Sequence, residues 1–515
     1  MLMGLVLGVT TIFSSVGTTG VTVYAAENGV TDADCTDKDT AAPTPDDTVP
    51  DANQYKYQKD ELAAFCHFGP NTFNELEWGF NQSTQKKLYE GRTPDEIFTL
   101  ESDFDAETLV NTLKNAGFKK LIVTAKHHDG FCIWNSAHTE YDIASTSYKN
   151  GEGDILAEIS EACTAANMDM GLYLSPWDVA ESTFGSDGGS INNAYNEYYN
   201  NQLEEILSNP KYGNKGHFVE VWMDGANGYN NVPQTYNFEK WYATIQKYEG
   251  IEAGYKADCM LFGAGTHTTV RWIGNENGFA GETCWSTIPS NTVYPGFKDY
   301  KQLQFGWEDG DQWTPAECDV SIRPGWFYHE KEDSKVKTVE DLCNLYYKSV
   351  GHNATMLLNF PVDKDGLIHP IDSANAVNFH RKIRQELSVN LLKGITPKVD
   401  SQQGKHIGKN ITDGQYDTFW ASKKKKDAYI EFQLGKPKSI TRLMLQEYIP
   451  LGQRVKAFSI YYQQGKNWVR LDPKEETTTI GYKRILRFDK ITTSGIRIVI
   501  DDAKGCPCIN SVSAF

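Results

Sequence analysis

Hydrophobic positions between about residues 55 and 385 follow two alternating patterns, one typical of buried strands and one typical of amphipathic helices. Residues 119–125 include an uninterrupted apolar run, as parallel strands buried on both faces require. Residues 105–116 have helical spacing, with Asp105 as the expected N-cap and Gly117 as the stop. Repeated strand–helix units over such a length predict a (β/α)8-like TIM barrel, an α/β fold.

The same two patterns place the other elements of the barrel. Strands are predicted at 170–174, 218–223, 259–262, 270–273 and 356–358, and helices at 154–167, 196–207, 238–248, 339–350 and 373–387. A doubly wound open sheet is the alternative, but no Gly-x-Gly-x-x-Gly sequence opens a helix here. The stretch from about 275 to 335 is rich in loops, so we expect an irregular barrel there.

The pattern of apolar and polar residues changes near residue 390, where short predicted strands separated by turns begin. They are predicted at 429–434, 440–447, 457–462, 467–471, 483–488 and 496–500. Such a series is typical of a β-sandwich. The charge changes as well: the chain from Asn390 onward carries a net charge of +10. Since the whole chain carries −18, the part before Asn390 carries −28. We therefore expect a barrel at 53–388 and a β-sandwich at 389–515.

An apolar segment opens the chain and is followed by small residues up to Ala26. Val23 and Ala25 fit the −3 and −1 positions of a signal-peptidase site, with a cut after Ala26 as a near alternative. The usual positive region is missing, since the first Lys or Arg is Lys38. A membrane anchor is the other interpretation, but Thr and Ser dilute the span. We expect residues 1–26 to be a signal peptide, and the protein to be secreted or at the cell surface.

Residues 27–52 are rich in Asp, Thr, Pro and Ala, and a disordered acidic linker is expected there. The acidic main body argues against nucleic acid as a partner, because phosphate neutralisation needs Lys and Arg. The ten cysteines show no metal-site spacing, and Cys66 and Cys132 lie in apolar runs typical of a core. One or two disulfides are compatible with the sequence, which does not assign them.

Two carboxylates that follow predicted strands are candidates for catalysis. Asp224 ends the apolar run 218–223, and Glu276 lies in a polar loop after the run 270–273. The carboxyl ends of barrel strands open onto the active site. Glycoside hydrolysis needs such a pair, because one carboxylate attacks the anomeric carbon or activates water while the other protonates the departing oxygen. The structural alternative for Asp224 is an Asp that caps a turn before a helix.

A second polar cluster, His127-His128-Asp129, follows the strand predicted at 119–125. Adjacent residues at a strand end diverge, so the two histidines are not expected to share a metal, and no His-x-x-x-His sequence completes a zinc set. We expect no metal in this site and no organic cofactor. Imidazoles that bind sugar hydroxyls are the preferred interpretation, with packed core histidines as the alternative. His67 occupies the equivalent place after the first strand.

Seven short motifs occur in order between about residues 55 and 385. They are His67-Phe68-Gly69, Glu77-Trp78-Gly79, residues 124–131, residues 171–178, residues 221–225, Arg271-Trp272-Ile273-Gly274-Asn275-Glu276 and residues 321–326. This series resembles glycoside hydrolase family 29, the α-L-fucosidases. The Arg-Trp-Ile-Gly-Asn-Glu form is similar to the subfamily that cuts α-1,3- and α-1,4-linked fucosyl branches.

The resemblance implies a retaining exo-α-L-fucosidase that acts on fucosylated glycans. It makes Asp224 the nucleophile and Glu276 the acid/base, with their carboxyl groups about 5 Å apart. The family positions that hold fucose are matched by His67, Glu77, Trp78, His127, His128 and Tyr173, with Trp222 lining the same pocket and Arg271 near the acid/base. A fucosidase of broader linkage specificity, altered on the acceptor side around residues 285–330, and a catalytically silent fucose-binding lectin are the alternatives.

The C-terminal segment has its own resemblance. Residues 412–420, which include Asp413-Gly414 and Thr418, and residues 446–455 are similar to the galactose-binding-like, F5/8 type C sandwich. Such domains often carry a structural calcium near this turn, so the resemblance implies one here. Lys423 to Lys426 form a basic run, for which a solvated loop is the preferred interpretation over a binding patch.

Overall fold

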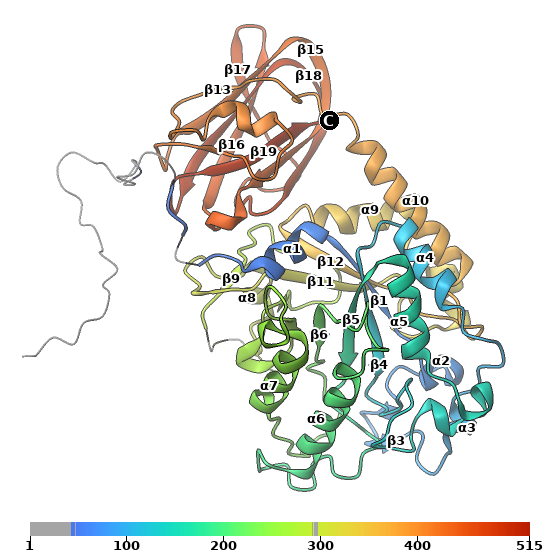
Figure 1. The fold of residues 1–515 in the computed structure, drawn as a ribbon. Helices are drawn as coiled ribbons and strands as arrows, with labels where there is room; N and C mark the ends of the chain where they lie inside the picture. Colours follow the sequence, from blue (N-terminus) through green and yellow to red (C-terminus); the bar gives the residue numbers. More distant parts are fainter. Residues whose placement is uncertain (1–34, 36–42, 47, 291, 293–296) are drawn as a thin grey trace, which may run out of the picture.

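A computed structural model describes residues 35, 43–46, 48–290, 292 and 297–515 of the 515-residue chain. It contains a barrel and a C-terminal β-domain, joined by the long helix α10 (Pro370–Glu386) (Figure 1). The predicted signal peptide and most of the predicted linker lie outside the described residues. None of the helices in the described part is long and apolar enough to cross a membrane.

Eight parallel strands form the barrel in the order in which they occur along the chain. They are β1 (Leu62–Cys66), β4 (Lys120–Lys126), β5 (Asp169–Leu174), β6 (Glu220–Trp222), β7 (Met260–Phe262), β8 (Arg271–Trp272), β11 (Ala316–Ser321) and β12 (Ala354–Asn359). β12 pairs with β1, and a parallel bridge between Phe262 and Val270 joins β7 to the residue that precedes β8. The ring is therefore almost closed, and the predicted (β/α)8-like barrel is confirmed.

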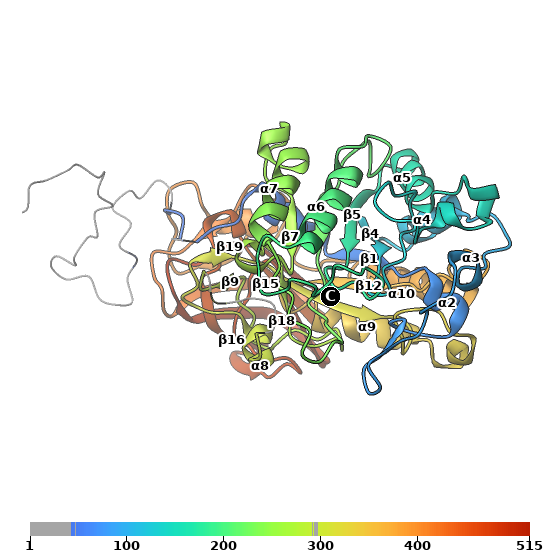
Figure 2. The ribbon, with the colours of Figure 1, turned by 90° about the horizontal axis from the view of Figure 1, so that it is seen from below.

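Helices follow most of these strands and cover the outside of the barrel. They are α4 (Ala106–Asn115), α5 (Ile155–Ala166), α6 (Ala194–Leu207), α7 (Phe238–Glu249), α9 (Val339–Lys348) and α10. The short α8 (Tyr300–Phe305) lies between β8 and β11, and α1 (Ala52–Asp60), α2 (Pro70–Asn74) and α3 (Pro94–Ile97) flank β1. Figure 2 shows α4 to α7 in a row along one side of the strands. The Asp105 carboxylate accepts from Thr108 N and caps α4, as predicted. Between β7 and β8 the described chain has one 3-10 turn, Gly265–His267, in place of an α-helix.

The stretch predicted as loop-rich contains a barrel strand that the pattern missed. In β11 (Ala316–Ser321) acidic residues alternate with small apolar ones, which is typical of a half-exposed strand, yet every residue is buried. The acidic side chains lie inside the barrel: Glu317 accepts from the Trp222 indole at 2.9 Å and from the Tyr57 hydroxyl of α1. The same stretch holds α8 and the short strands β9 (Thr287–Ile288) and β10 (Gln312–Trp313). A small hairpin, β2 (Phe80–Asn81) with β3 (Lys86–Lys87), lies earlier in the chain.

The C-terminal domain is an antiparallel β-sandwich. Its strands are β13 (Lys398–Val399), β14 (Trp420–Ala421), β15 (Ala428–Glu447), β16 (Val455–Gln464), β17 (Asn467–Leu471), β18 (Arg484–Ala503) and β19 (Cys508–Ala514). β15 and β18 each join two strands that were predicted separately, and their pairing shifts register between Gln433 and Lys438. β19 was not predicted. The buried residues form a core separate from that of the barrel.

The turn expected to carry calcium is satisfied by the protein itself. Asp413 accepts from the Thr418 hydroxyl at 2.7 Å and from Gln415 N at 2.8 Å. No group of three His, Cys, Asp or Glu side chains that could hold a metal ion occurs in the described ranges. The structure therefore gives no support for a structural calcium here. A disulfide joins Cys35 to Cys506.

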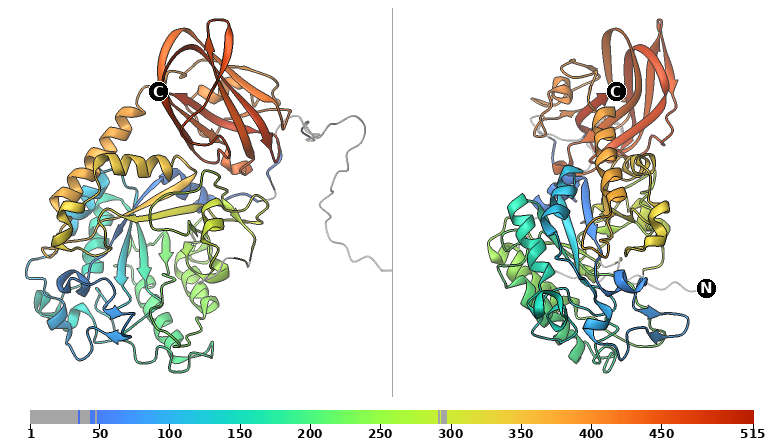
Figure 3. Two further views of the ribbon diagram at one scale, coloured as in Figure 1. Left: turned by 180° about the vertical axis from the view of Figure 1, so that it is seen from behind. Right: turned by 90° about the vertical axis from the view of Figure 1, so that its right-hand side faces the viewer.

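The sandwich packs against the amino-terminal ends of the barrel strands (Figure 3). Lys483 forms an ion pair with Glu61, the residue before β1. Asn353, the residue before β12, accepts from Tyr482 N at 2.7 Å and donates to Gln453 Oε1 at 3.3 Å. Because active sites of such barrels lie at the other end, this packing leaves the carboxyl ends of the strands open.

The Asn353→Ala substitution should weaken this domain interface. The Asn353 side chain is buried, so its loss leaves buried groups such as Tyr482 N without a partner, and its φ of 66° is unfavourable for Ala. We expect the free energy of unfolding to fall by about 2–4 kcal/mol, measured by guanidinium unfolding followed through tryptophan fluorescence. The control is Asn378→Ala on the exposed face of α10, and equal effects of the two substitutions would contradict the interpretation.

Candidate active site

A cavity of about 660 Å³ lies at the carboxyl ends of the barrel strands. His67 directly follows β1, His127 directly follows β4, Asp224 comes after β6 and Glu276 after β8. All ten site residues expected from the sequence line this cavity: His67, Glu77, Trp78, His127, His128, Tyr173, Trp222, Asp224, Arg271 and Glu276. Side chains spread over 210 positions of the chain thus meet in one place, because parallel strands end at the same edge of the barrel.

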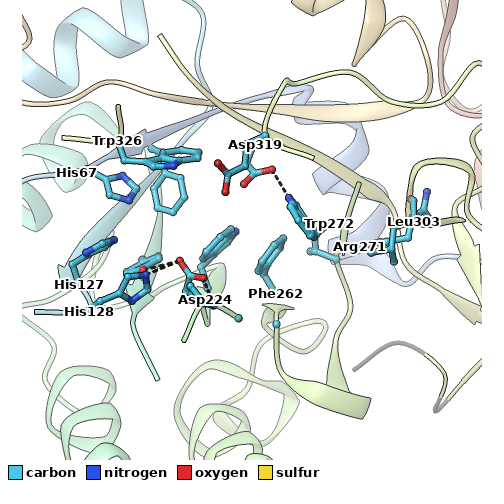
Figure 4. A pocket seen from close by; sticks show the side chains of 18 of the residues that line it. His67, His127, His128, Asp224, Phe262, Arg271, Trp272, Leu303, Asp319 and Trp326 are labelled. Atoms are coloured by element: carbon cyan, nitrogen blue, oxygen red, sulfur yellow. Dashed lines mark hydrogen bonds and ion pairs between the residues drawn. The ribbon is translucent and has the colours of Figure 1, made fainter. Parts of the chain in front are cut away.

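Asp224 accepts two hydrogen bonds and lies beside His128 (Figure 4). The Tyr173 hydroxyl donates to Oδ2 at 3.0 Å, and Ala226 N donates to Oδ1 at 2.8 Å. His128 Nε2 lies 3.6 Å from Oδ2. The Asp224 side chain remains 24% exposed, so it is held in one orientation and is still open to the cavity. A carboxylate in this setting can act as a nucleophile.

Glu276 reaches the same cavity from a loop and remains in contact with solvent at its mouth. The cavity walls nevertheless remove part of its hydration, and this burial, together with the negative charges of Asp224 and Glu77, raises the pKa of Glu276. A raised pKa keeps a carboxyl group protonated at higher pH, as a general acid requires. The surroundings of Glu276 thus suit a proton donor, whereas the hydrogen bonds to Asp224 orient it as a nucleophile requires.

A third carboxyl group, that of Asp319 on β11, also lines the cavity. It is buried and accepts from the Trp272 indole at 2.8 Å (Figure 4). Burial and the charges of Glu276 and Glu317 raise its pKa well above the ordinary value, which favours the protonated form of this group. Asp319 was not among the residues expected from the sequence, because it lies in the stretch predicted to be loop-rich. Its alternation with Glu317 and small residues gave no signal of a buried strand.

Hydrogen bonds fix the tautomers of two of the histidines. The Ser175 hydroxyl donates to Trp177 O at 2.6 Å, so its oxygen accepts from His128 Nδ1, 2.7 Å away. Asn359 donates its amide to Ser321 and Trp326, so its carbonyl oxygen accepts from His67 Nδ1 at 2.8 Å. Each imidazole then has its proton on Nδ1 and a free lone pair on Nε2. A lone pair on Nε2 can accept a hydrogen bond from a hydroxyl.

Burial favours the neutral form of all three histidines. Burial lowers the pKa of His67 to about 3, it lowers that of His127 well below the usual value, and it lowers that of His128 despite the charges of Asp224 and Asp178. His127 Nδ1 is buried and has no hydrogen-bond partner among the described residues.

Glu77 is held at the rim of the cavity by two contacts. One oxygen accepts from Trp326 N at 2.9 Å, and the other lies 2.7 Å from His329 Nε2. Burial opposes protonation of His329, but the nearby Glu77 and Glu75 carboxylates outweigh it and raise the pKa of this histidine. Gly325 makes the approach of Glu77 feasible, since a Cβ there would lie 2.4 Å from the carboxylate. His329 was not among the predicted residues.

Aromatic rings form the apolar walls of the cavity. Trp222 stacks on Phe262 with ring centres 3.8 Å apart, and its indole nitrogen is bonded to Glu317, so only the ring faces the cavity. Phe65, Trp78 and Trp326 add further aromatic surface. Walls of this kind suit the C–H faces and methyl groups of a sugar.

Arg271 lines the cavity, but its guanidinium group binds the protein. It donates to Leu303 O at 2.9 Å and to Thr314 O at 3.2 Å, and the third nitrogen lies 3.6 Å from Cys284 Sγ. The side chain is almost fully buried. These contacts favour a positioning role for Arg271 over direct contact with a sugar, while its expected role in substrate binding stays a prediction.

Known proteins similar to this chain identify its family. A protein-family model described as alpha-L-fucosidase matches residues 31–379. A Ruminococcus gnavus GH29 fucosidase, solved in complex with fucose, is 48% identical, with a TM-score of 0.85 over 93% of this chain and 98% of that one. The chain belongs to the α-L-fucosidases of glycoside hydrolase family 29. It is therefore a glycoside hydrolase.

Other relatives of this α-L-fucosidase agree. Alpha-L-fucosidase 1 of Arabidopsis thaliana is 35% identical over 481 residues, which cover 92% of this chain and 88% of the relative. A glycoside hydrolase 29 family member from an unknown rumen bacterium is 32% identical, with a TM-score of 0.77 over 92% of this chain and 78% of that one. A model of the F5/8 type C domain matches residues 396–513, which confirms the expected type of sandwich.

The Tyr173→Phe substitution tests the hydroxyl that orients Asp224 in this α-L-fucosidase. A hydrogen bond to a charged group is lost, so we expect kcat/KM on an α-L-fucoside to fall roughly 10- to 100-fold. Steady-state kinetics at one pH measure the effect. Tyr199→Phe is the matched control, since its buried hydroxyl donates to the backbone oxygen of Leu174 at 2.7 Å, and its kcat/KM should change less than threefold. Similar losses in both variants would contradict a specific role.

Proposed function

We propose that this protein is a retaining exo-α-L-fucosidase that removes α-1,3- and α-1,4-linked fucose from oligosaccharides and glycoconjugates. The observation that carries the proposal is the pair of carboxyl groups, Asp224 and Glu276, on one cavity in different electrostatic surroundings. Hydrogen bonds to Tyr173 and Ala226 orient Asp224, while burial and neighbouring charges favour the protonated form of Glu276. Two such groups are what a two-step displacement needs.

In the first step an Asp224 oxygen attacks the anomeric carbon of fucose. The bond from that carbon to the glycosidic oxygen breaks, and Glu276 gives its proton to this oxygen, so the acceptor sugar leaves as an alcohol. In the second step Glu276, now a carboxylate, takes a proton from water, and the water oxygen displaces Asp224. Both carboxyl groups return to their starting forms, and fucose leaves with its original anomeric configuration.

The polar groups of the cavity match the hydroxyls of fucose. His67 and His128 present Nε2 lone pairs, His127 lines the same cavity, and Glu77 is held at the rim. Fucose is a 6-deoxy sugar, and its methyl group needs an apolar wall such as the aromatic faces provide. The linkage preference is supported by the form of the motif Arg271–Glu276, which resembles the α-1,3/1,4-specific subfamily. We also infer that the protein is exported, on the apolar run and small residues of 1–26.

The test of this function is a substrate panel with the wild-type enzyme and Asp224→Ala. Trisaccharides that carry fucose in α-1,3 or α-1,4 linkage should release fucose faster than a 2′-linked or core-fucosylated substrate, and Asp224→Ala should release none. Proton NMR of the first product should show the α-anomer. Equal rates across the panel would favour broad specificity, no release by the wild type would indicate a lectin, and initial β-anomer would exclude retention.

The pH dependence of kcat/KM should report the raised pKa of Glu276. A general acid must be protonated, so activity is lost as pH rises through this pKa. We call this loss the basic limb of the pH profile, and we expect its midpoint to lie above 4.5, the ordinary pKa of a Glu side chain. Glu77→Gln removes one of the negative charges that raise the pKa, so the basic limb should move to lower pH by ~0.5 unit, although overall activity also falls.

The control for this experiment is Glu75→Gln. Glu75 lies against the other nitrogen of the same histidine, with its oxygen 3.2 Å from His329 Nδ1, and it is not among the charges that shift Glu276. Its substitution should leave the basic limb in place. An equal movement in both variants would show that His329, and not the charge of Glu77, sets the limb.

A further inference from the structure

One side of the cavity is not used by the proposed fucose contacts. The polar groups proposed to bind fucose lie in β5 or follow β1, β4 and β6, whereas the remaining wall is formed by β8 and the segment that leads to β11. This wall includes Trp272, Ile288, Phe297, Tyr300 and Leu303, together with Phe262 and Val270. This wall is mostly apolar, so it offers few partners for sugar hydroxyls and ample surface for a ring.

Tyr300 is the most exposed large residue on this wall. It is the first residue of α8, and half of its surface (50%) is open to solvent although it lines the cavity. Its ring meets that of Trp272 edge to face, with centres 5.7 Å apart. Aromatic rings that line a cavity are preferred surfaces for the apolar faces of ligands.

Three contacts fix Tyr300 in this place. Arg271 binds Leu303 O and so holds the end of α8, and Asp319 fixes the indole of Trp272. Gly274 packs directly against the backbone of Tyr300, since a Cβ on this glycine would lie 2.4 Å from the backbone carbonyl oxygen of Tyr300. The ring is therefore positioned by buried groups, as a binding surface requires.

The same contacts place Tyr300 beside the acid/base. Gly274 stands two residues before Glu276, so the loop that carries this carboxyl group rests on Tyr300. A general acid must lie within hydrogen-bond distance of the oxygen that it protonates. That oxygen belongs to the leaving sugar after cleavage, so the leaving sugar must lie on the side of the cavity from which Glu276 approaches.

We propose that Tyr300, backed by Trp272, is the platform for the pyranose ring of the leaving sugar, and so contributes to the choice of glycan. The inference rests on the proposed function of Glu276 as the acid/base. It assigns the fucose ring to the side of His67, His127 and Asp224, and the acceptor ring to the side of Tyr300. In this arrangement the exposed phenol ring is covered when an oligosaccharide binds.

The experiment compares two substrates that differ in the leaving group. A fucosylated trisaccharide places a sugar on the platform, whereas α-L-fucosyl fluoride leaves it empty. For Tyr300→Ala we expect the ratio of kcat/KM on the trisaccharide to kcat/KM on the fluoride to fall about tenfold. For Tyr300→Phe, which keeps the ring, the ratio should stay within about threefold of wild type. Tyr416 is an exposed tyrosine on the sandwich (44%), and Tyr416→Ala should leave the ratio unchanged.

The outcomes separate the two proposals. If the wild type prefers another linkage, the linkage proposal fails, and the ratio is then measured on the preferred oligosaccharide. If Glu276→Gln hydrolyses the trisaccharide normally, the assignment of the acid/base fails and this inference fails with it. A ratio unchanged in Tyr300→Ala overturns the platform alone. A loss confined to 4-nitrophenyl α-L-fucoside would mean that an aryl group, not a pyranose, is the occupant. Activity on the fluoride reports that each variant is folded.

Discussion

The active site depends on how the barrel closes between β7 and β8. This closure consists of the bridge from Phe262 to Val270, next to a β8 of two residues and without an α-helix between the two strands. Glu276 lies in the loop that follows β8, whereas Asp224 follows β6 on the other side of the gap. The separation of the two carboxyl groups therefore follows from the position of a strand that has few backbone hydrogen bonds of its own.

Buried side chains supply what the backbone does not. Arg271 ties β8 to the backbone at Leu303 and Thr314, and Trp272 is bonded to Asp319 of the neighbouring β11. Removing one partner of such a buried contact leaves the other unsatisfied, so these contacts are costly to break. Arg271 was expected from the sequence as a residue that touches substrate. Its surroundings favour the interpretation that it supports the loop of the acid/base.

The barrel and the polar groups at the strand ends could be predicted from the sequence pattern, because the strands of the first half are continuous apolar runs and each ends in a polar group. Asp224, His67 and His127 are examples of this pattern. The other expected site residues were implied only by the family resemblance: Glu77, Trp78, Tyr173, Trp222 and Arg271. The prediction failed at β11, where Glu317 and Asp319 alternate with small residues and imitate a solvent-facing segment. Their burial depends on partners from elsewhere in the chain, such as Tyr57 and Trp272, which local pattern cannot reveal. For the same reason the sequence did not indicate that the ring of Tyr300 lies exposed in the cavity.

The placement of the sandwich has a practical consequence. Since it docks where the barrel strands begin, through Asn353 and Glu61, it is on the opposite side from the entrance to the cavity. A bead, surface or reporter protein coupled to the sandwich would point away from incoming polymer chains. The enzyme could thus be immobilised by this domain in a glycan-processing column and keep its entrance facing the flowing solution.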